Sequence, residues 1–110
     1  MDYQTAHNLL ITQGMDATQH SDSLLSRLKQ GSPPVPGQVT QILLALKVVL
    51  DALKDATAID RDLAYSLLLL SIQSHEYFDN GDRAGVEWAP MLKEDLDRIS
   101  GAVESIFRGS

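Results

Sequence analysis

Large apolar residues recur at steps of four and three near the end of the chain, and this is its clearest pattern. Side chains with this spacing lie on one face of an α-helix. Pro90 stands just before them and suits the first turn of a helix, where its missing amide costs nothing. We predict a last helix that begins near Pro90 and buries one face, which comprises Leu92, Leu96, Ile99, Val103 and Ile106.

Two segments in the middle of the chain, 38–56 and 60–78, also have a helical period. The first is apolar over most of its circumference, which is typical of a central helix. In the second, Asp60 is the predicted N-cap, because its carboxylate accepts hydrogen bonds from the free amides of the first turn. Asn80-Gly81 supplies the left-handed conformers that end a helix. We predict that these two helices form the central pair of the fold.

The first segment carries a helical stripe that keeps its phase up to Gly31. We predict one long helix here, with a break near Gly14 as the alternative, because glycine costs about 1 kcal/mol in a helix interior. The stretch 14–21 is poor in large apolar side chains, so a bend or a frayed zone is expected there. The stripe comprises Ala6, Leu10, Gly14, Ala17, Ser21, Leu24 and Leu28.

A proline-rich stretch, 31–37, separates the first helix from the second. Its three prolines have no amide donors, so neither a helix nor a central strand passes through it. No segment alternates polar and apolar residues between turns, which argues against a sheet. We therefore predict an all-α fold, an antiparallel four-helix bundle that forms a single domain over residues 1–110.

The composition narrows the classes of partner. Hydrophobic residues make up 44% of the chain and aromatics only 5%, so the core must be mainly aliphatic. The net charge of −6 opposes binding to nucleic acid or to an anionic membrane. There is no cysteine and no basic, apolar leader pattern. We expect a cytoplasmic protein with neither nucleic acid nor membrane as a partner.

Ser71 and His75 lie one helical turn apart, near the middle of the apolar face of the third helix. One interpretation is a hydroxyl polarised by an imidazole, which begins nucleophilic catalysis, or a small ligand pocket around the pair. The other is structural, with Ser71 bonded to a preceding carbonyl and His75 under the last turn. A triad also needs an orienting carboxylate and an oxyanion hole, and no Gly-x-Ser-x-Gly motif is present.

The chain contains no motif for a metal or a nucleotide. His7 and His20 are too far apart to chelate one ion, and neither His-Glu-x-x-His nor Glu-x-x-His occurs. The acids of 79–82 lack the spacing of a calcium loop, and the phosphate-binding Gly-x-x-x-x-Gly-Lys-Ser/Thr loop is absent. We predict no catalytic residue, no cofactor and no metal ligand.

Leu69 is the most unusual residue in the pattern. Its helical angle places it among Asp62, Ser66, Gln73 and Glu76, on the polar strip of the third helix. A single exposed leucine needs no explanation. With neighbouring apolar residues, however, it predicts a patch for self-association. The candidate interface comprises Leu69, Tyr65 and Tyr77, with Leu44 and Val48 at its edge.

Three stretches of the chain resemble a small all-helical protein family of cyanobacteria: Gln4–Leu10, Pro36–Thr40 and Arg83–Trp88. Some members of that family bear the name dethiobiotin synthetase, which denotes an ATP-dependent ligase with a P-loop and an α/β fold. This chain has neither the loop nor the length for that enzyme. The resemblance therefore implies a helical protein without an assigned activity, and no functional residue is carried over.

These observations favour a non-enzymatic protein-interaction module or a homodimeric adaptor, whose partner is a second copy or another protein. The alternative is a small-molecule-binding bundle with a core pocket near Ser71 and His75. A third possibility is an enzyme of unknown class, for which the sequence offers only dispersed acids.

Overall fold

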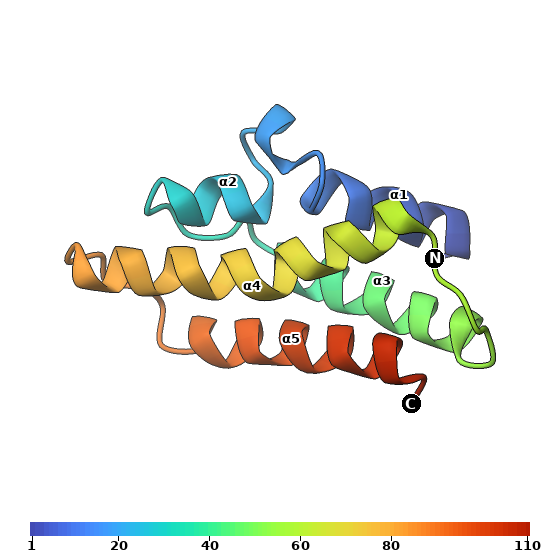
Figure 1. Cartoon of the computed structure of the whole chain (residues 1–110). Coiled ribbons are helices and arrows are strands. Elements are labelled where there is room, and N and C mark those ends of the chain that lie inside the picture. Colours follow the sequence, from blue (N-terminus) through green and yellow to red (C-terminus); the bar gives the residue numbers. More distant parts are fainter.

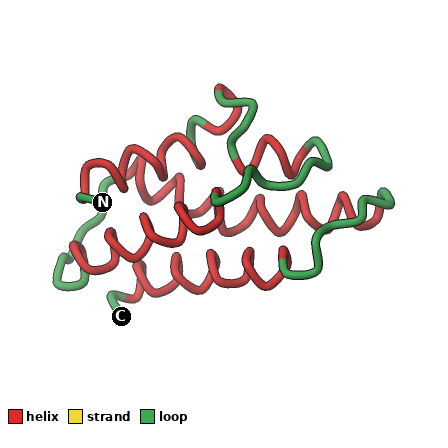
Figure 2. Tube along the Cα trace, turned by 180° about the vertical axis from the view of Figure 1, so that it is seen from behind, coloured by secondary structure: helices red, strands yellow, loops and turns green.

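The computed structural model describes all residues, 1–110, and is all-helical, as predicted. No strand is present, and Figure 2 shows only helices and loops. Both termini lie at the same end of the bundle (Figures 1 and 2). The elements in chain order are α1 (Tyr3–Gln13), the short 3₁₀ turn η1 (Ala17–Gln19), α2 (Leu24–Lys29), α3 (Gln38–Leu53), α4 (Arg61–Arg83) and α5 (Leu92–Arg108).

Four helices form a closed ring around the core (Figure 1). α1 packs against α3 and α4, and α5 closes the ring by packing against the same two helices. Consecutive long helices run in opposite directions, whereas the ring neighbours α1 and α4, and likewise α3 and α5, run in the same direction. The predicted central pair, α3 and α4, is wrong, because these helices face each other across the ring. Each is broadly apolar because it packs against both α1 and α5.

The first helix is broken, so the single long helix is wrong and the alternative break near Gly14 is correct. α1 ends at Gln13 and the chain turns outward through η1 before α2 begins (Figure 1). The cause is a close approach to α4: a Cβ on Gly14 would lie 2.6 Å from Ser66 Cβ and 2.7 Å from its Cα. The Met15 amide then donates to Ser66 Oγ at 3.1 Å instead of to its own helix. The predicted stripe is nevertheless buried at Ala17 and Leu24, whereas Ser21 lies in the exposed connection between η1 and α2.

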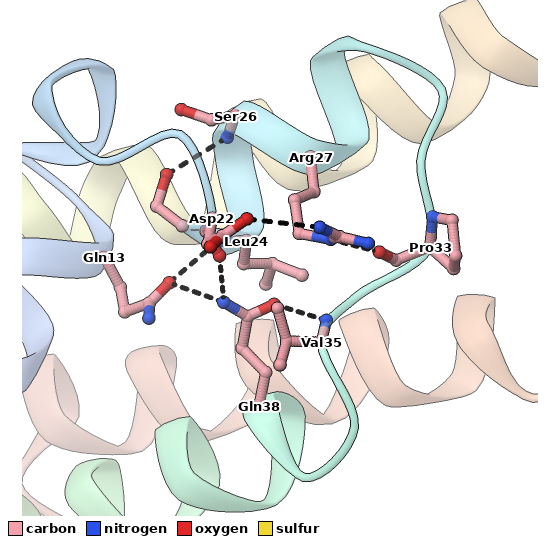
Figure 3. A network of polar contacts seen from close by, with 9 residues as sticks. Gln13, Asp22, Leu24, Ser26, Arg27, Pro33, Val35 and Gln38 are labelled. Carbon is pink, nitrogen blue, oxygen red and sulfur yellow. Dashed lines mark hydrogen bonds and ion pairs between the residues drawn. The ribbon is translucent and has the colours of Figure 1, made fainter.

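Two glutamines hold the broken segment in place (Figure 3). Gln13 Oε1 accepts from the first amide of α2, that of Leu24, at 2.8 Å. From the first turn of α3, Gln38 Nε2 donates to the Asp22 carbonyl at 2.7 Å, while its Oε1 accepts from the Val35 amide at 3.1 Å. These side chains thus satisfy backbone groups of the two connections, before α2 and before α3, that have no helical partners.

α4 begins as predicted, with Asp60 as its N-cap: Asp60 Oδ2 accepts from the Leu63 amide at 3.0 Å. The predicted end at Asn80-Gly81 is wrong, because the helix continues to Arg83. Gly85, at φ +89°, supplies the left-handed residue, and the Val86 amide donates back to the Gly81 carbonyl at 2.9 Å. This is a Schellman closure one turn later than expected.

Gly81 has a different role, because its missing side chain leaves space for the only tryptophan, Trp88, to pack against α4. A Cβ on Gly81 would lie 2.4 Å from Trp88 Cζ2. The indole stacks on Phe78 with 5.8 Å between ring centroids, and its Nε1 donates to the Phe78 carbonyl at 3.0 Å. The connection between α4 and α5 is therefore packed onto the end of α4. Pro90 lies in the turn that precedes α5 and not in its first turn.

The core is aliphatic, as the composition predicts, and the α5 stripe is buried in full. No helix has the length and apolar character needed to cross a bilayer. The largest side chains that are fully enclosed are those of Leu10, Leu24, Leu28, Ile42, Leu46, Leu63, Leu67, Leu70, Leu96 and Ile99.

Candidate functional site

The outer face of α4 carries more exposed large hydrophobic residues than any other helix. Tyr65, Leu68 and Ile72 are 50%, 47% and 55% exposed. Their spacing of three and four residues puts them in one line along the helix. In Figure 1, α4 lies between α1 and α2 on one side and α5 on the other, and the exposure of the three side chains shows that these helices leave the line partly uncovered. We call Tyr65, Leu68 and Ile72 the outer stripe.

Four consecutive leucines, 67–70, point to different sides of α4, and one of them belongs to the outer stripe. Leu67 and Leu70 point into the core and are fully buried. Leu69 is half-buried and packs against the core from the side of α2. Leu68 is 47% exposed and faces Phe107 of α5 across a groove. The core or α2 covers the other leucines of this run, and no contact within the chain covers the exposed half of Leu68.

A groove between α4 and α5 extends the apolar surface beyond the outer stripe. Leu68 and Ile72 line one wall, and Phe107, which is 52% exposed, lines the other. Gly101 opens the floor, since a Cβ there would meet nothing within 4 Å. Asp97 and Glu104 also line the groove, so its α5 side is acidic. The surface is thus an apolar strip with a charged border, which is typical of a helix-binding face.

Ser71 lines this groove, and His75 lies one turn further along α4, where it reaches Asp97 of the groove; both residues lie between α4 and α5 and not in the core. His75 Nδ1 is 2.9 Å from the Ser71 carbonyl, and its Nε2 is 2.8 Å from Asp97 Oδ1. Ser71 Oγ donates to Ser100 Oγ at 3.0 Å. The predicted core pocket around this pair is therefore wrong: both residues are half-exposed and fastened to α5.

This polar cluster contains an aspartate, a histidine and three serines, and its bonds join α4 to α5. His75 Nδ1 lies 2.9 Å from the Ser71 carbonyl oxygen and 3.4 Å from both Ser74 Oγ and Ser100 Oγ, and its Nε2 lies 2.8 Å from Asp97 Oδ1. Sequence reasoning missed Asp97 because it belongs to another helix. Only the fold brings it to His75.

The predicted interface residues of α4 gather in a second groove, on the opposite side of the outer stripe. Tyr65, Leu69 and Tyr77 line it together with Met15 and Lys29. The prediction that Leu69 is exposed is wrong, because α2 packs on that side of α4 and half-buries it. Tyr65 belongs to both this groove and the outer stripe.

Leu44 and Val48 do not join these residues. Both belong to α3, which lies across the ring from α4. Leu44 is 43% exposed and Val48 is half-buried. The structure therefore splits the predicted interface into an α4 part and an unconnected α3 part.

A second histidine cluster fastens α1 to the start of α4. His7 Nε2 is 2.9 Å from Asp60 Oδ1, and the Tyr3 ring packs 6.0 Å from the imidazole. Burial raises the pKa of Asp60, but hydrogen bonds from the Leu63 amide and from His7 outweigh it, so the pKa lies below its usual value. Burial and the nearby Asp60 charge raise the pKa of Tyr3. The cluster is a structural clamp at one end of the bundle.

No group of three or more His, Asp or Glu side chains lies close enough together to hold a metal ion. Comparisons with protein-family models, curated proteins and solved structures give no match to this chain. The resemblance to the cyanobacterial family thus stays a prediction. Function has to be inferred from the surface of the molecule, where the outer stripe and the α4–α5 groove stand out.

Proposed function

We propose that the chain is a non-enzymatic protein-interaction module that binds a helix of its partner along the outer stripe of α4. The observation that carries this proposal is the uninterrupted line of Tyr65, Leu68 and Ile72, each about half exposed, with Phe107 beside it. Contiguous apolar surface of this kind marks binding faces on monomeric proteins.

The energetic scale supports a contact of moderate strength. Burying a large apolar side chain completely stabilises by about 1.5–3 kcal/mol. The three residues of the outer stripe are about half exposed, so burying the rest of their surface contributes roughly 2–4 kcal/mol before the costs of association. Phe107 and the groove walls add to this. A partner that covers only the outer stripe would bind weakly, so the groove belongs to the same contact.

The polar clusters support a role without catalysis. His7 and His75 each bond to a carboxylate from another part of the ring, Asp60 and Asp97, and these bonds join neighbouring helices. We also propose a cytoplasmic location, which suits a chain without cysteine.

A position-specific crosslink tests the proposal. A photo-activatable amino acid replaces Ile72 in one variant and Leu44 in a control, since both are exposed aliphatic residues in the middle of a long helix. After irradiation of the full chain, alone and in an extract of its own cells, mass spectrometry identifies each adduct. We expect a defined protein crosslinked from position 72 and not from 44. Equal labelling from both positions would refute the choice of face, and no adduct from either would refute the module.

A further inference from the structure

The charges at the two ends of the outer stripe are opposite in sign. Arg61 lies seven residues before Leu68, and Asp79 lies seven residues after Ile72, so both continue the same line along α4. Arg61 and Asp79 are exposed, and neither takes part in any ion pair within the chain. Along this line, the apolar middle is therefore bounded by Arg61 at one end and by Asp79, followed one turn later by Arg83, at the other.

We propose that the partner of this face is a second copy of the chain, with the two α4 helices packed antiparallel. This inference rests on the proposed function and names its partner. A two-fold axis midway between Leu68 and Ile72 places Leu68 against Ile72 of the partner subunit. Arg61 then faces Asp79 of the partner subunit, and symmetry repeats each contact.

Charge complementarity selects this partner and this direction. A parallel pairing of two copies would put Arg61 against its own equivalent and Asp79 against its own equivalent, which is repulsive at both ends. A uniformly basic helix would suit Asp79 but would repel Arg61. The antiparallel second copy satisfies both charges at once.

Two neighbouring residues fit the same arrangement. Tyr65 lies opposite the helical turn of the partner subunit that carries Glu76, an exposed acid without an ion pair in the chain. Its hydroxyl can donate to that carboxylate. Phe107 shares a groove with Leu68 and Ile72, so it covers the edge of the contact. The net charge of −6 on each copy opposes association at long range, and salt near physiological strength screens this repulsion while sparing close pairs.

A charge exchange tests the register. The variants are Arg61→Asp, Asp79→Arg and the double variant, with Asp51→Arg on the exposed side of α3 as a control for the change in net charge. Sedimentation equilibrium measures the dimer dissociation constant. Each α4 single variant turns two attractive pairs into two repulsive ones, so we expect the dissociation constant to rise roughly 10- to 30-fold. The double variant should return it to near the wild-type value, and Asp51→Arg should leave it unchanged.

Intramolecular contact cannot produce that rescue, because residues 61 and 79 are about 27 Å apart along a straight helix. Both substitutions suit the helix dipole, since they place an acid at the start of α4 and a base near its end, so circular dichroism should show unchanged helicity.

Engineered cysteines give a second measurement, free of background because the chain has no cysteine. Under mild oxidation, a mixture of Arg61→Cys and Asp79→Cys proteins should form a mixed disulfide, whereas either protein alone should form little. Disulfides within each single variant would show parallel pairing and overturn the register.

A double variant that dimerises no more tightly than the single variants would also overturn the antiparallel register. A wild-type chain that stays monomeric at concentrations on the order of 1 mM overturns self-pairing altogether. In that case an adduct from position 72 to a different protein keeps the proposed function, and the absence of any adduct removes both.

Discussion

Replacing Gly14 with alanine tests the close approach of α1 to α4. The new Cβ would lie 2.6 Å from Ser66 Cβ and 2.7 Å from the Ser66 Cα and carbonyl oxygen. Two of these three atoms are backbone, so no change of rotamer relieves the overlap, and the helices must separate. Overpacking of this kind costs about 1–3 kcal/mol. Losing the hydrogen bond from the Met15 amide to Ser66 Oγ adds about 1 kcal/mol.

The expected loss for Gly14→Ala is therefore roughly 2–4 kcal/mol, which corresponds to a melting temperature lower by about 8–16 °C for a domain of this size. Thermal unfolding followed by circular dichroism measures it. The matched control is Gly101→Ala in α5, where a Cβ meets nothing within 4 Å and alanine should stabilise by about 0.4–1 kcal/mol. A continuous first helix predicts that Gly14→Ala also stabilises, so a raised melting temperature would refute the broken helix.

Two further predictions concern the ends of α4. Gly81→Ala should displace Trp88, because the new Cβ would lie 2.4 Å from its ring, and the fluorescence of this single tryptophan should then shift to the red. The control is Gly85→Asn, at a left-handed position that asparagine tolerates, and it should leave the fluorescence unchanged. An unshifted spectrum for Gly81→Ala would contradict the packing of Trp88 on α4. For Asp60, the pKa in the folded state lies below the ordinary value of 3.8, so its ionised form stabilises the fold above that value and this contribution is lost as the pH falls through the folded-state pKa. Asp60→Asn, which keeps an N-cap, should therefore be less stable than wild type at pH 7, and this difference in the free energy of unfolding should narrow in acid. Urea denaturation at pH 7 and in acid measures the difference. A difference independent of pH would refute the role of the charge.

Periodicity predicted the faces that pack within the ring. All five residues of the α5 stripe are buried, and Asp60 begins α4 as its side-chain chemistry required. Both predictions depended on local rules, namely the spacing of apolar side chains and the free amides of a first turn. Information of this kind is contained in a single helix.

The errors arose where a residue's environment depends on a helix distant in sequence. Leu69 lies among polar residues on its own helical wheel, yet α2 half-buries it, whereas its neighbour Leu68 is 47% exposed at the edge of α5. Gly14 keeps the helical phase, and only its distance to Ser66 shows why the helix ends there. Asp97 reaches His75 from α5. For the candidate site, the sequence placed Tyr65 on an exposed face of α4, whereas the exposure of Leu68 and Ile72 became visible only in the assembled fold.

The diagonal placement of α3 and α4 affects the order in which a nascent chain can assemble. Two helices joined by a short connection usually fold as a hairpin, but here neither covers the apolar face of the other. α1 and α3 are neighbours and can pair while the rest of the chain is still being synthesised. α4 then adds to an incomplete ring, in which α1 and α2 cover part of its apolar face while the side that faces α5 stays exposed to water until α5 is made. Of the four ring helices, the last in chain order is thus the one that closes the ring around the core.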